Sequence, residues 1–168
     1  LSFMPSFGFA ITLMAVVGRA IGAGDPELAS RQTYRALCAT IIYMGCIGFM
    51  FLIFRNHLIG LFTDSPHIIA IGSHILILVA IFQIFDASQM VFVHALRGAG
   101  DTKWPAKVSG ILCATLFLGG GYTVAKFFPQ FQSLGPWGMA TIYMITLGCI
   151  MALRWSFGPW RKMTIFQS

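Results

Sequence analysis

The sequence has very little charge. Only 10% of its 168 residues are Asp, Glu, Lys or Arg, while 57% are hydrophobic and the mean hydropathy is +0.80. A soluble domain carries about 25% charged residues, so this chain is too apolar to cover a globule with a water-compatible surface. We therefore expect an all-α integral membrane protein in contact with the lipid bilayer, and not a soluble domain.

Motifs for catalysis, metal binding and nucleotide binding are also lacking. The four cysteines form no CxxC pair, and no Cys/His or Glu/His spacing fits zinc. No Gly-Lys-Ser/Thr follows a glycine-rich turn, which excludes a P-loop, and no Ser/His/Asp constellation is visible. The basic residues, which give a net charge of +6, form no basic face with stacking aromatics. These absences argue against an enzyme, a bound cofactor and a nucleic-acid partner.

Long hydrophobic runs are what the sequence does contain. There are five, each near the roughly 17–25 residues that a membrane helix needs, with charged residues at their edges apart from one Asp. Continuous apolar runs of this length favour helices over barrel strands, which alternate and are short. The approximate spans are 1–21, 36–54, 67–96, 106–126 and 135–154. We expect a partial helix bundle with no signal peptide, cut inside or just before its first helix.

Short polar or glycine-containing segments mark the ends of these helices. Asp25 is placed to cap the helix that follows it, and Asp64-Ser65-Pro66 is a start signal for the third span. The segments "RAIGAGD" (19–25) and "ALRGAGD" (95–101) echo each other. Their glycines let the chain leave a helix in conformations closed to other residues. We expect both copies to end a helix on the same side of the membrane.

The basic residues are divided unevenly between the two sides of the membrane. Five alternating spans place nine on one side, namely Arg19, Arg31, Arg35, Arg97, Lys103, Lys107, Arg154, Arg161 and Lys162. The other side holds Arg55 and Lys126. Since cytoplasmic loops carry the excess of Lys and Arg, this distribution predicts a multi-pass protein with a cytoplasmic C-terminus.

One acidic residue, Asp86, lies within a predicted span. The other four acidic residues fall in connections: Asp25, Glu27, Asp64 and Asp101. An acid at the middle of a membrane helix costs about 2.5–3.5 kcal/mol on insertion scales, so its presence is a functional hypothesis by default. The alternative is that Asp86 only hydrogen-bonds a neighbouring helix and holds the bundle together.

The helical neighbours of Asp86 form a polar stripe. Gln83 and Gln89 lie three residues to either side, on the same face of the helix. Carboxylate and amide oxygens are ligands for hard cations, and burial favours the protonated acid. We therefore expect this stripe to bind a proton or a small cation, with Asp86 as a candidate Na⁺ ligand. The candidate lining of an apolar substrate cavity is Phe82, Phe85 and Met90, although such residues usually just pack on neighbours or lipid.

Three motifs, in their order and spacing, resemble the C-terminal half of the multidrug and toxic compound extrusion (MATE) family, and most closely its NorM-like branch. They are "PSFGFAITLMAVVGRAIGAGDPELA" (5–29), "FQIFDASQMVFVHALRGAGDTKWP" (82–105) and "RWSFGPWRKM" (154–163). The resemblance implies helices 8–12 of a twelve-helix transporter built from two six-helix bundles, with the N-terminal bundle and helix 7 outside this chain. It also implies a secondary active antiporter of a bacterial-type inner (plasma) membrane, which expels small amphipathic, often cationic compounds in exchange for Na⁺ or H⁺.

The resemblance also bears on the intramembrane acid. In NorM-like members an acidic residue of helix 10 belongs to the cation site, and Asp86 matches it. Some members have a Tyr one turn earlier, where this chain has Phe82. Because Phe offers no oxygen ligand, both Na⁺ and H⁺ stay open.

Two other functions remain as alternatives. A lipid-linked saccharide flippase-type exporter would need a larger and more basic central cavity, whereas every Lys and Arg here lies at a predicted membrane edge. A non-transporting membrane scaffold subunit would tolerate the substitution Asp86→Asn without effect.

Overall fold

The computed structural model describes residues 4–128 and 134–162, and these are almost entirely helical. The elements, in chain order, are α1 (Met4–Gly22), α2 (Pro26–Gly60), α3 (Pro66–Gly98), α4 (Lys103–Leu112), the π-helix η1 (Cys113–Gly120), α5 (Gly121–Phe127), α6 (Leu134–Phe157) and the short 3₁₀ helix η3 (Pro159–Lys162). In the described residues, five helical segments are long and apolar enough to cross a membrane, with α4, η1 and α5 forming one of them. The prediction of an all-α, five-helix membrane protein is confirmed.

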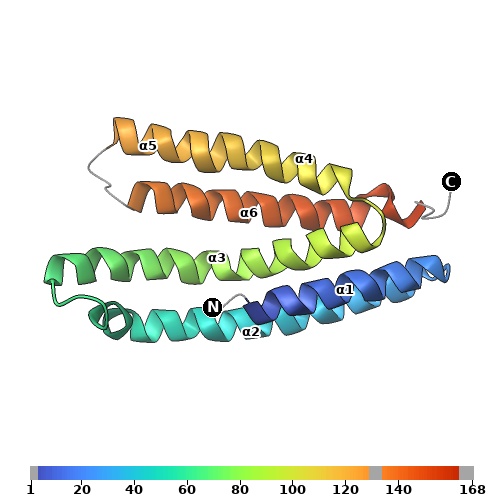
Figure 1. Cartoon of the computed structure of the whole chain (residues 1–168), viewed down its shortest axis with the longest axis horizontal. Coiled ribbons are helices and arrows are strands. Elements are labelled where there is room, and N and C mark those ends of the chain that lie inside the picture. The colour runs from blue at the N-terminus through green and yellow to red at the C-terminus, as the bar shows by residue number, and fades with distance from the viewer. Residues whose placement is uncertain (1–3, 129–133, 163–168) are drawn as a thin grey trace.

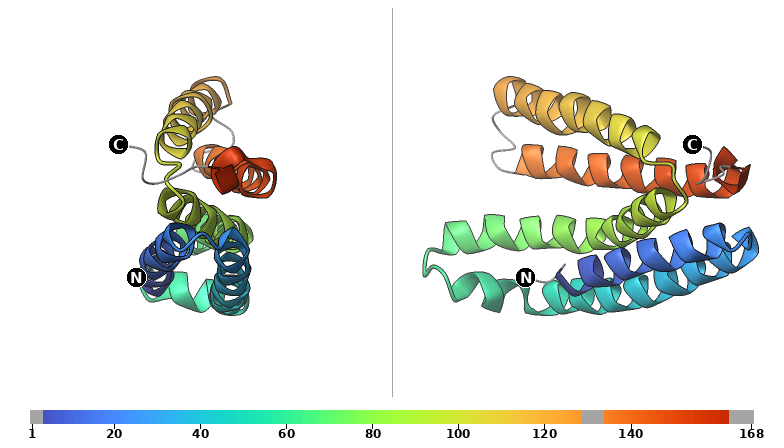
Figure 2. Two further views of the ribbon diagram at one scale, coloured as in Figure 1. Left: turned by 90° about the vertical axis from the view of Figure 1, so that its right-hand side faces the viewer. Right: turned by 45° about the vertical axis from the view of Figure 1, so that its right-hand side comes forward.

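The helices lie side by side, with α3 in the middle (Figures 1 and 2). α1 and α2 pack on one side of α3, and α6 packs on the other. The segment α4–η1–α5 is outermost and contacts α6. The ends that carry most of the basic residues, including the C-terminal ends of α1, α3 and α6, gather at one end of the bundle (Figure 1). We refer to it as the basic end.

α2 extends well beyond its predicted span of 36–54, whereas α3 matches its predicted span of 67–96 to within two residues at each end. α2 has 35 residues and α3 has 33; at 1.5 Å per residue each is about 50 Å long, whereas the hydrocarbon core is about 30 Å thick. α2 already includes Arg31 and Arg35, which precede the predicted span 36–54. A change from apolar to charged residues marks a membrane edge but does not end a helix, which is why the boundaries predicted for α2 lie too far inward.

The two glycine-containing turns have the same backbone structure. Gly24 and Gly100 have φ values of +77° and +92°, a region that only glycine enters without cost. In each turn the N–H of the following Asp donates to a carbonyl five residues earlier, from Asp25 to Ala20 and from Asp101 to Leu96, at 2.9 Å in both cases. This is the Schellman pattern of helix termination. The echo in the sequence therefore encodes one turn used twice.

The helix starts agree with their sequence signals. The Oδ1 atom of Asp25 accepts a hydrogen bond of 2.8 Å from the backbone N–H of Leu28 and so caps α2. Pro66 begins α3, with Ser65 before it making no side-chain capping bond. Asp25 therefore acts as the predicted cap, while the start of α3 depends on its proline.

The buried hydrophobic core is concentrated toward the basic end. It combines Val17 and Ala20 of α1, the apolar residues of the segment Val91–Leu96 of α3, and Leu147, Met151 and Trp155 of α6. Many large apolar side chains elsewhere are exposed, as expected for a surface that faces lipid. The tight packing therefore leaves Asp86 at the edge of the core, nearer the middle of α3.

The fourth predicted span is not a simple α-helix. Its central part, Cys113–Gly120, is a π-helix, a rare form usually limited to single turns. A glycine run, Gly119–Gly121, closes this segment. Glycine is a weak helix former, so the composition allows the departure, but the sequence pattern did not predict it.

Candidate functional site

Asp86 lies in the middle of α3 and is half-buried. Both salt bridges between described residues lie elsewhere, so Asp86 has no ion pair within that part of the chain. The described residues also contain no group of three His, Cys, Asp or Glu side chains that could hold a metal ion. An unpaired carboxyl group within a membrane helix is costly, which makes it the strongest candidate for a functional group.

The two glutamines of the polar stripe differ in their surroundings. Gln83 is only 4% exposed, and its Nε2 atom has no hydrogen-bond partner in the described structure. Gln89 is half-buried. A buried amide without a partner costs about 1–3 kcal/mol, so Gln83 is not explained by stability. It lies one helical turn from Asp86 and is available to a ligand that reaches this face.

The aromatic candidates Phe82 and Phe85 pack against α6. The Phe82 ring stacks on Trp137, with centroids 6.4 Å apart and planes 8° from parallel. The carbonyl oxygen of Phe85 would lie 2.9 Å from a Cβ atom built on Gly148, so the two helices approach closely here. Both residues therefore form the α3–α6 contact in this conformation, and Met90 is half-buried on α3.

α6 also brings Tyr143 to the candidate site. Its hydroxyl group and the Asp86 carboxyl group influence each other electrostatically. The Tyr143 ring also contacts Phe117 of η1, with centroids 5.9 Å apart. Sequence reasoning missed Tyr143 because its position depends on which helix packs against α3.

A small apolar pocket lies between η1 and α6, on the far side of this contact. It has a volume of about 250 Å³ and is lined by Phe117, Pro136, Trp137 and Ala140. Trp137 connects it to Phe82 through their stacked rings. The pocket adjoins the predicted cavity residues but none of them lines it.

Two of the three histidines of α3, His74 and His94, contact carbonyl groups of their own helix. The Nδ1 atom of His74 lies 2.7 Å from the carbonyl oxygen of Ala70, and that of His94 lies 2.8 Å from Met90. His94 is buried, with its ring edge against Phe7 of α1. These contacts hold the rings in place, so the site that the structure presents is centred on Asp86.

The fold and site define a multi-pass helical membrane protein with one unpaired intramembrane carboxyl group. Comparison with known families identifies it further: the family model MatE matches residues 1–122. The chain belongs to the MATE family.

The similarity of the chain to three transport proteins agrees with this assignment. The chain is 31% identical over 168 residues to the probable multidrug resistance protein NorM of Thermotoga maritima, covering 98% of this chain and 35% of that protein. It is 30% identical over 160 residues to a NorM protein of Mesorhizobium japonicum, covering 92% of this chain and 34% of that protein. The multidrug resistance protein MdtK of Yersinia pseudotuberculosis is 24% identical over 160 residues, 92% of this chain and 35% of that protein. The chain thus spans about a third of the length of these relatives.

Proposed function

We propose that this chain forms helices 8–12 of a cation-coupled multidrug efflux antiporter, with helix 7 and the N-terminal bundle supplied by the rest of the transporter. Membership of the MATE family and the names of the relatives support this proposal. The substrates would be small amphipathic compounds, often cationic. Transport without enzymatic chemistry agrees with the lack of a catalytic motif in the sequence.

The observation that carries the proposal is the half-buried Asp86 carboxyl group, which has no ion pair among the described residues. In the proposed mechanism this group takes up Na⁺ or H⁺ from the outer side. Uptake removes the cost of an unpaired charge within the membrane and so favours one conformation of the bundle over the other. Gln83 and Gln89 would orient or ligate the ion, while Phe82, Phe85 and Met90 would line the substrate cavity after the α3–α6 contact has opened.

The proposed location is the bacterial-type inner (plasma) membrane, with the C-terminus in the cytoplasm. The nine-to-two division of basic residues supports this orientation. In the described part of the chain the basic residues of the larger group belong to the helix ends gathered at the basic end (Figure 1). In the described residues this arrangement leaves no basic central cavity of the kind that a lipid-linked saccharide flippase would need. The names of the relatives support neither that alternative nor a scaffold subunit.

The test is drug efflux by the complete transporter, wild type beside Asp86→Asn, with the Na⁺ and H⁺ gradients collapsed in turn. We expect the variant to insert normally and to lose gradient-driven efflux, and the gradient that drives the wild type identifies the ion. Asp64→Asn is the matched control, because Asp64 is an exposed acid in the connection between α2 and α3. Normal efflux by Asp86→Asn would show that the acid is structural and that coupling occurs elsewhere.

A further inference from the structure

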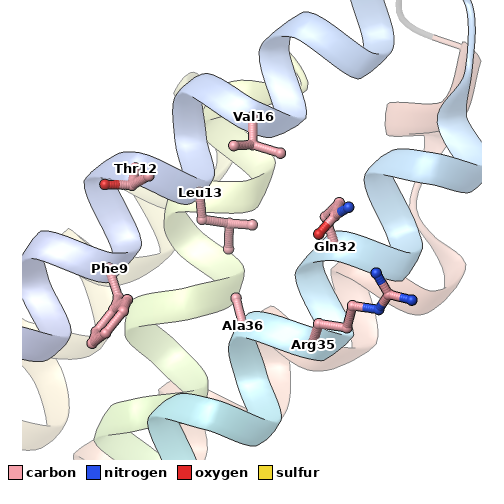
Figure 3. A pocket seen from close by; sticks show the side chains of 7 residues that line it. All are labelled: Phe9, Thr12, Leu13, Val16, Gln32, Arg35 and Ala36. Carbon is pink, nitrogen blue, oxygen red and sulfur yellow. The ribbon is translucent and has the colours of Figure 1, made fainter.

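A groove between α1 and α2 combines apolar walls with one unpaired cation. Its volume is about 220 Å³, and it is lined by Phe9, Thr12, Leu13 and Val16 of α1 and by Gln32, Arg35 and Ala36 of α2. Figure 3 shows Leu13 and Val16 projecting from α1 into the space between the helices, with Gln32 and Arg35 on the α2 side. The groove lies away from Asp86 and plays no part in the proposed ion coupling.

Arg35 is among the arginines that have no ion pair to a described residue. Arg31 pairs with Glu27 and Arg154 pairs with Asp101, whereas Arg35 has no ion pair or hydrogen bond to a described residue. Gln32 also makes no hydrogen bond within that part of the chain, while Thr12 donates to the carbonyl oxygen of Gly8. The groove therefore offers a guanidinium and an amide, both free to bind an anion.

The direction of these side chains fits the edge of a membrane. Side chains of a helix tilt toward its N-terminus, and the N-terminus of α2 lies at the basic end (Figure 1). Arg35 immediately precedes the apolar span 36–54, so we expect its long stem to lie along apolar surface and its charged head to reach toward the headgroups. Phe9 and Leu13 continue the groove away from that end, along the depth of the hydrocarbon.

We propose that this groove binds an anionic phospholipid of the cytoplasmic leaflet. Arg35 and Gln32 hold the phosphate, because a guanidinium makes strong charge-assisted hydrogen bonds to phosphate oxygens, and Phe9, Leu13 and Val16 contact an acyl chain. A cationic drug is a poorer occupant, because Arg35 repels it. A free phosphate ion would make no use of the apolar wall. The proposal rests on the orientation proposed above but not on Asp86 or its ion.

The experiment uses the complete transporter in lipid nanodiscs that contain phosphatidylglycerol with a photoactivatable acyl chain. After illumination, peptide mapping locates the labelled residues, and phosphatidylcholine with the same group serves as the comparison lipid. We expect phosphatidylglycerol to label the α1 and α2 walls of the groove preferentially. Arg35→Gln should reduce that labelling about fivefold, the effect of one basic residue at an anionic membrane surface, and Arg35→Lys should retain most of it.

Two further variants separate a specific site from general attraction to the membrane. Lys107→Gln removes one charge from an exposed residue of α4 at the same end and should leave the groove labelling unchanged. Val16→Phe keeps every charge but fills the apolar wall and should lower the labelling, which provides a test even if Arg35→Gln fails to insert.

Three results would overturn the proposal. The first is equal labelling of the groove by both lipids, or labelling unaffected by Arg35→Gln and Val16→Phe. The second is an unlabelled groove beside labelled lipid-facing helices, which would mean that another part of the transporter covers it. The third is displacement by inorganic phosphate added to the buffer, which would indicate a site for free anions.

Discussion

Asp101 and Arg154 form a largely buried ion pair across 53 residues of sequence. The Nε atom of Arg154 donates a hydrogen bond of 2.9 Å to Oδ2 of Asp101, and its Nη2 atom lies 2.8 Å from the same oxygen. Asp101 is 5% exposed, and the guanidinium lies 4.6 Å from the centroid of the Trp104 ring. Asp101 ends the second glycine-containing turn, so the pair ties the α3–α4 connection to the last turn of α6.

Breaking this pair should destabilise the basic end of the bundle. Arg154→Gln leaves the Asp101 carboxylate buried without its cation, which typically costs about 3–5 kcal/mol for a buried pair. Because Arg154 is partly exposed, we expect a loss of about 3 kcal/mol. The measurement is the thermal unfolding of the complete transporter in detergent, where the variant should melt at a clearly lower temperature.

The matched control is the exposed pair between Arg31 and Glu27, whose atoms are 3.3 Å apart. Arg31→Gln should change the melting temperature little, because exposed ion pairs contribute about 0–1 kcal/mol. The double variant Asp101→Asn/Arg154→Gln should cost less than the sum of the two single variants. Additive losses would mean that the two side chains stabilise the fold independently.

The close contact of α3 with α6 makes Gly148 a sensitive position. A Cβ atom there would lie 2.9 Å from the carbonyl oxygen of Phe85, so Gly148→Ala forces the two helices apart. Overpacking of this kind costs about 1–3 kcal/mol, measured by thermal unfolding. Gly45→Ala in α2 is the control: nothing lies within 4 Å of its Cβ position, and alanine is the better helix former. A Gly148→Ala protein as stable as Gly45→Ala would contradict the close approach.

Features encoded by neighbouring residues were predictable from the sequence. The hydrophobic runs predicted the five membrane helices, and Asp25 and Pro66 predicted the starts of α2 and α3. The repeated Gly-Ala-Gly-Asp segment predicted two equivalent helix ends, because each turn needs a residue with positive φ, and Gly24 and Gly100 supply it. Each of these depends on local backbone chemistry, which a single sequence carries in full.

Features that depend on helix pairing were not predictable. Both Asp25 and Asp101 end the same motif, yet one caps a helix and the other binds Arg154. Similarly, Asp86 could be identified because a charge within an apolar run is visible in the sequence itself, whereas Tyr143, which influences it electrostatically, lies more than fifty residues later in the chain. Neighbouring residues in the sequence do not determine which helix packs against α3.

We predict that Gln83 lowers the stability of the protein but is needed for transport. Its buried Nε2 atom has no partner in the described structure, so Gln83→Leu removes an unsatisfied group and keeps a side chain of similar size. We expect the melting temperature to stay equal or rise, since relief of a buried unpaired amide gains about 1 kcal/mol or more, while efflux falls. Lower stability together with normal efflux would show that Gln83 hydrogen-bonds elsewhere in the complete transporter and has no part in transport.

Tyr143 should tune the ion dependence of transport if Asp86 is the coupling group. Tyr143→Phe removes the hydroxyl group near the Asp86 carboxyl but keeps the ring that contacts Phe117. If the hydroxyl contacts the bound ion with the strength of one hydrogen bond, about 0.5–1.5 kcal/mol, its loss should raise the cation concentration for half-maximal efflux by about fivefold at nearly unchanged stability.

The control for this prediction is Tyr122→Phe, because Tyr122 of α5 is exposed and its hydroxyl should have no effect on the ion dependence. In an Asp86→Glu background, where a carboxyl group is retained at a slightly different position, the effect of Tyr143→Phe should change in size, since residues that act on one ion are not additive. An unchanged ion dependence in Tyr143→Phe would show that the hydroxyl takes no part in cation binding. Coupling would then depend on Asp86 with ligands from α3 itself or from the remainder of the transporter.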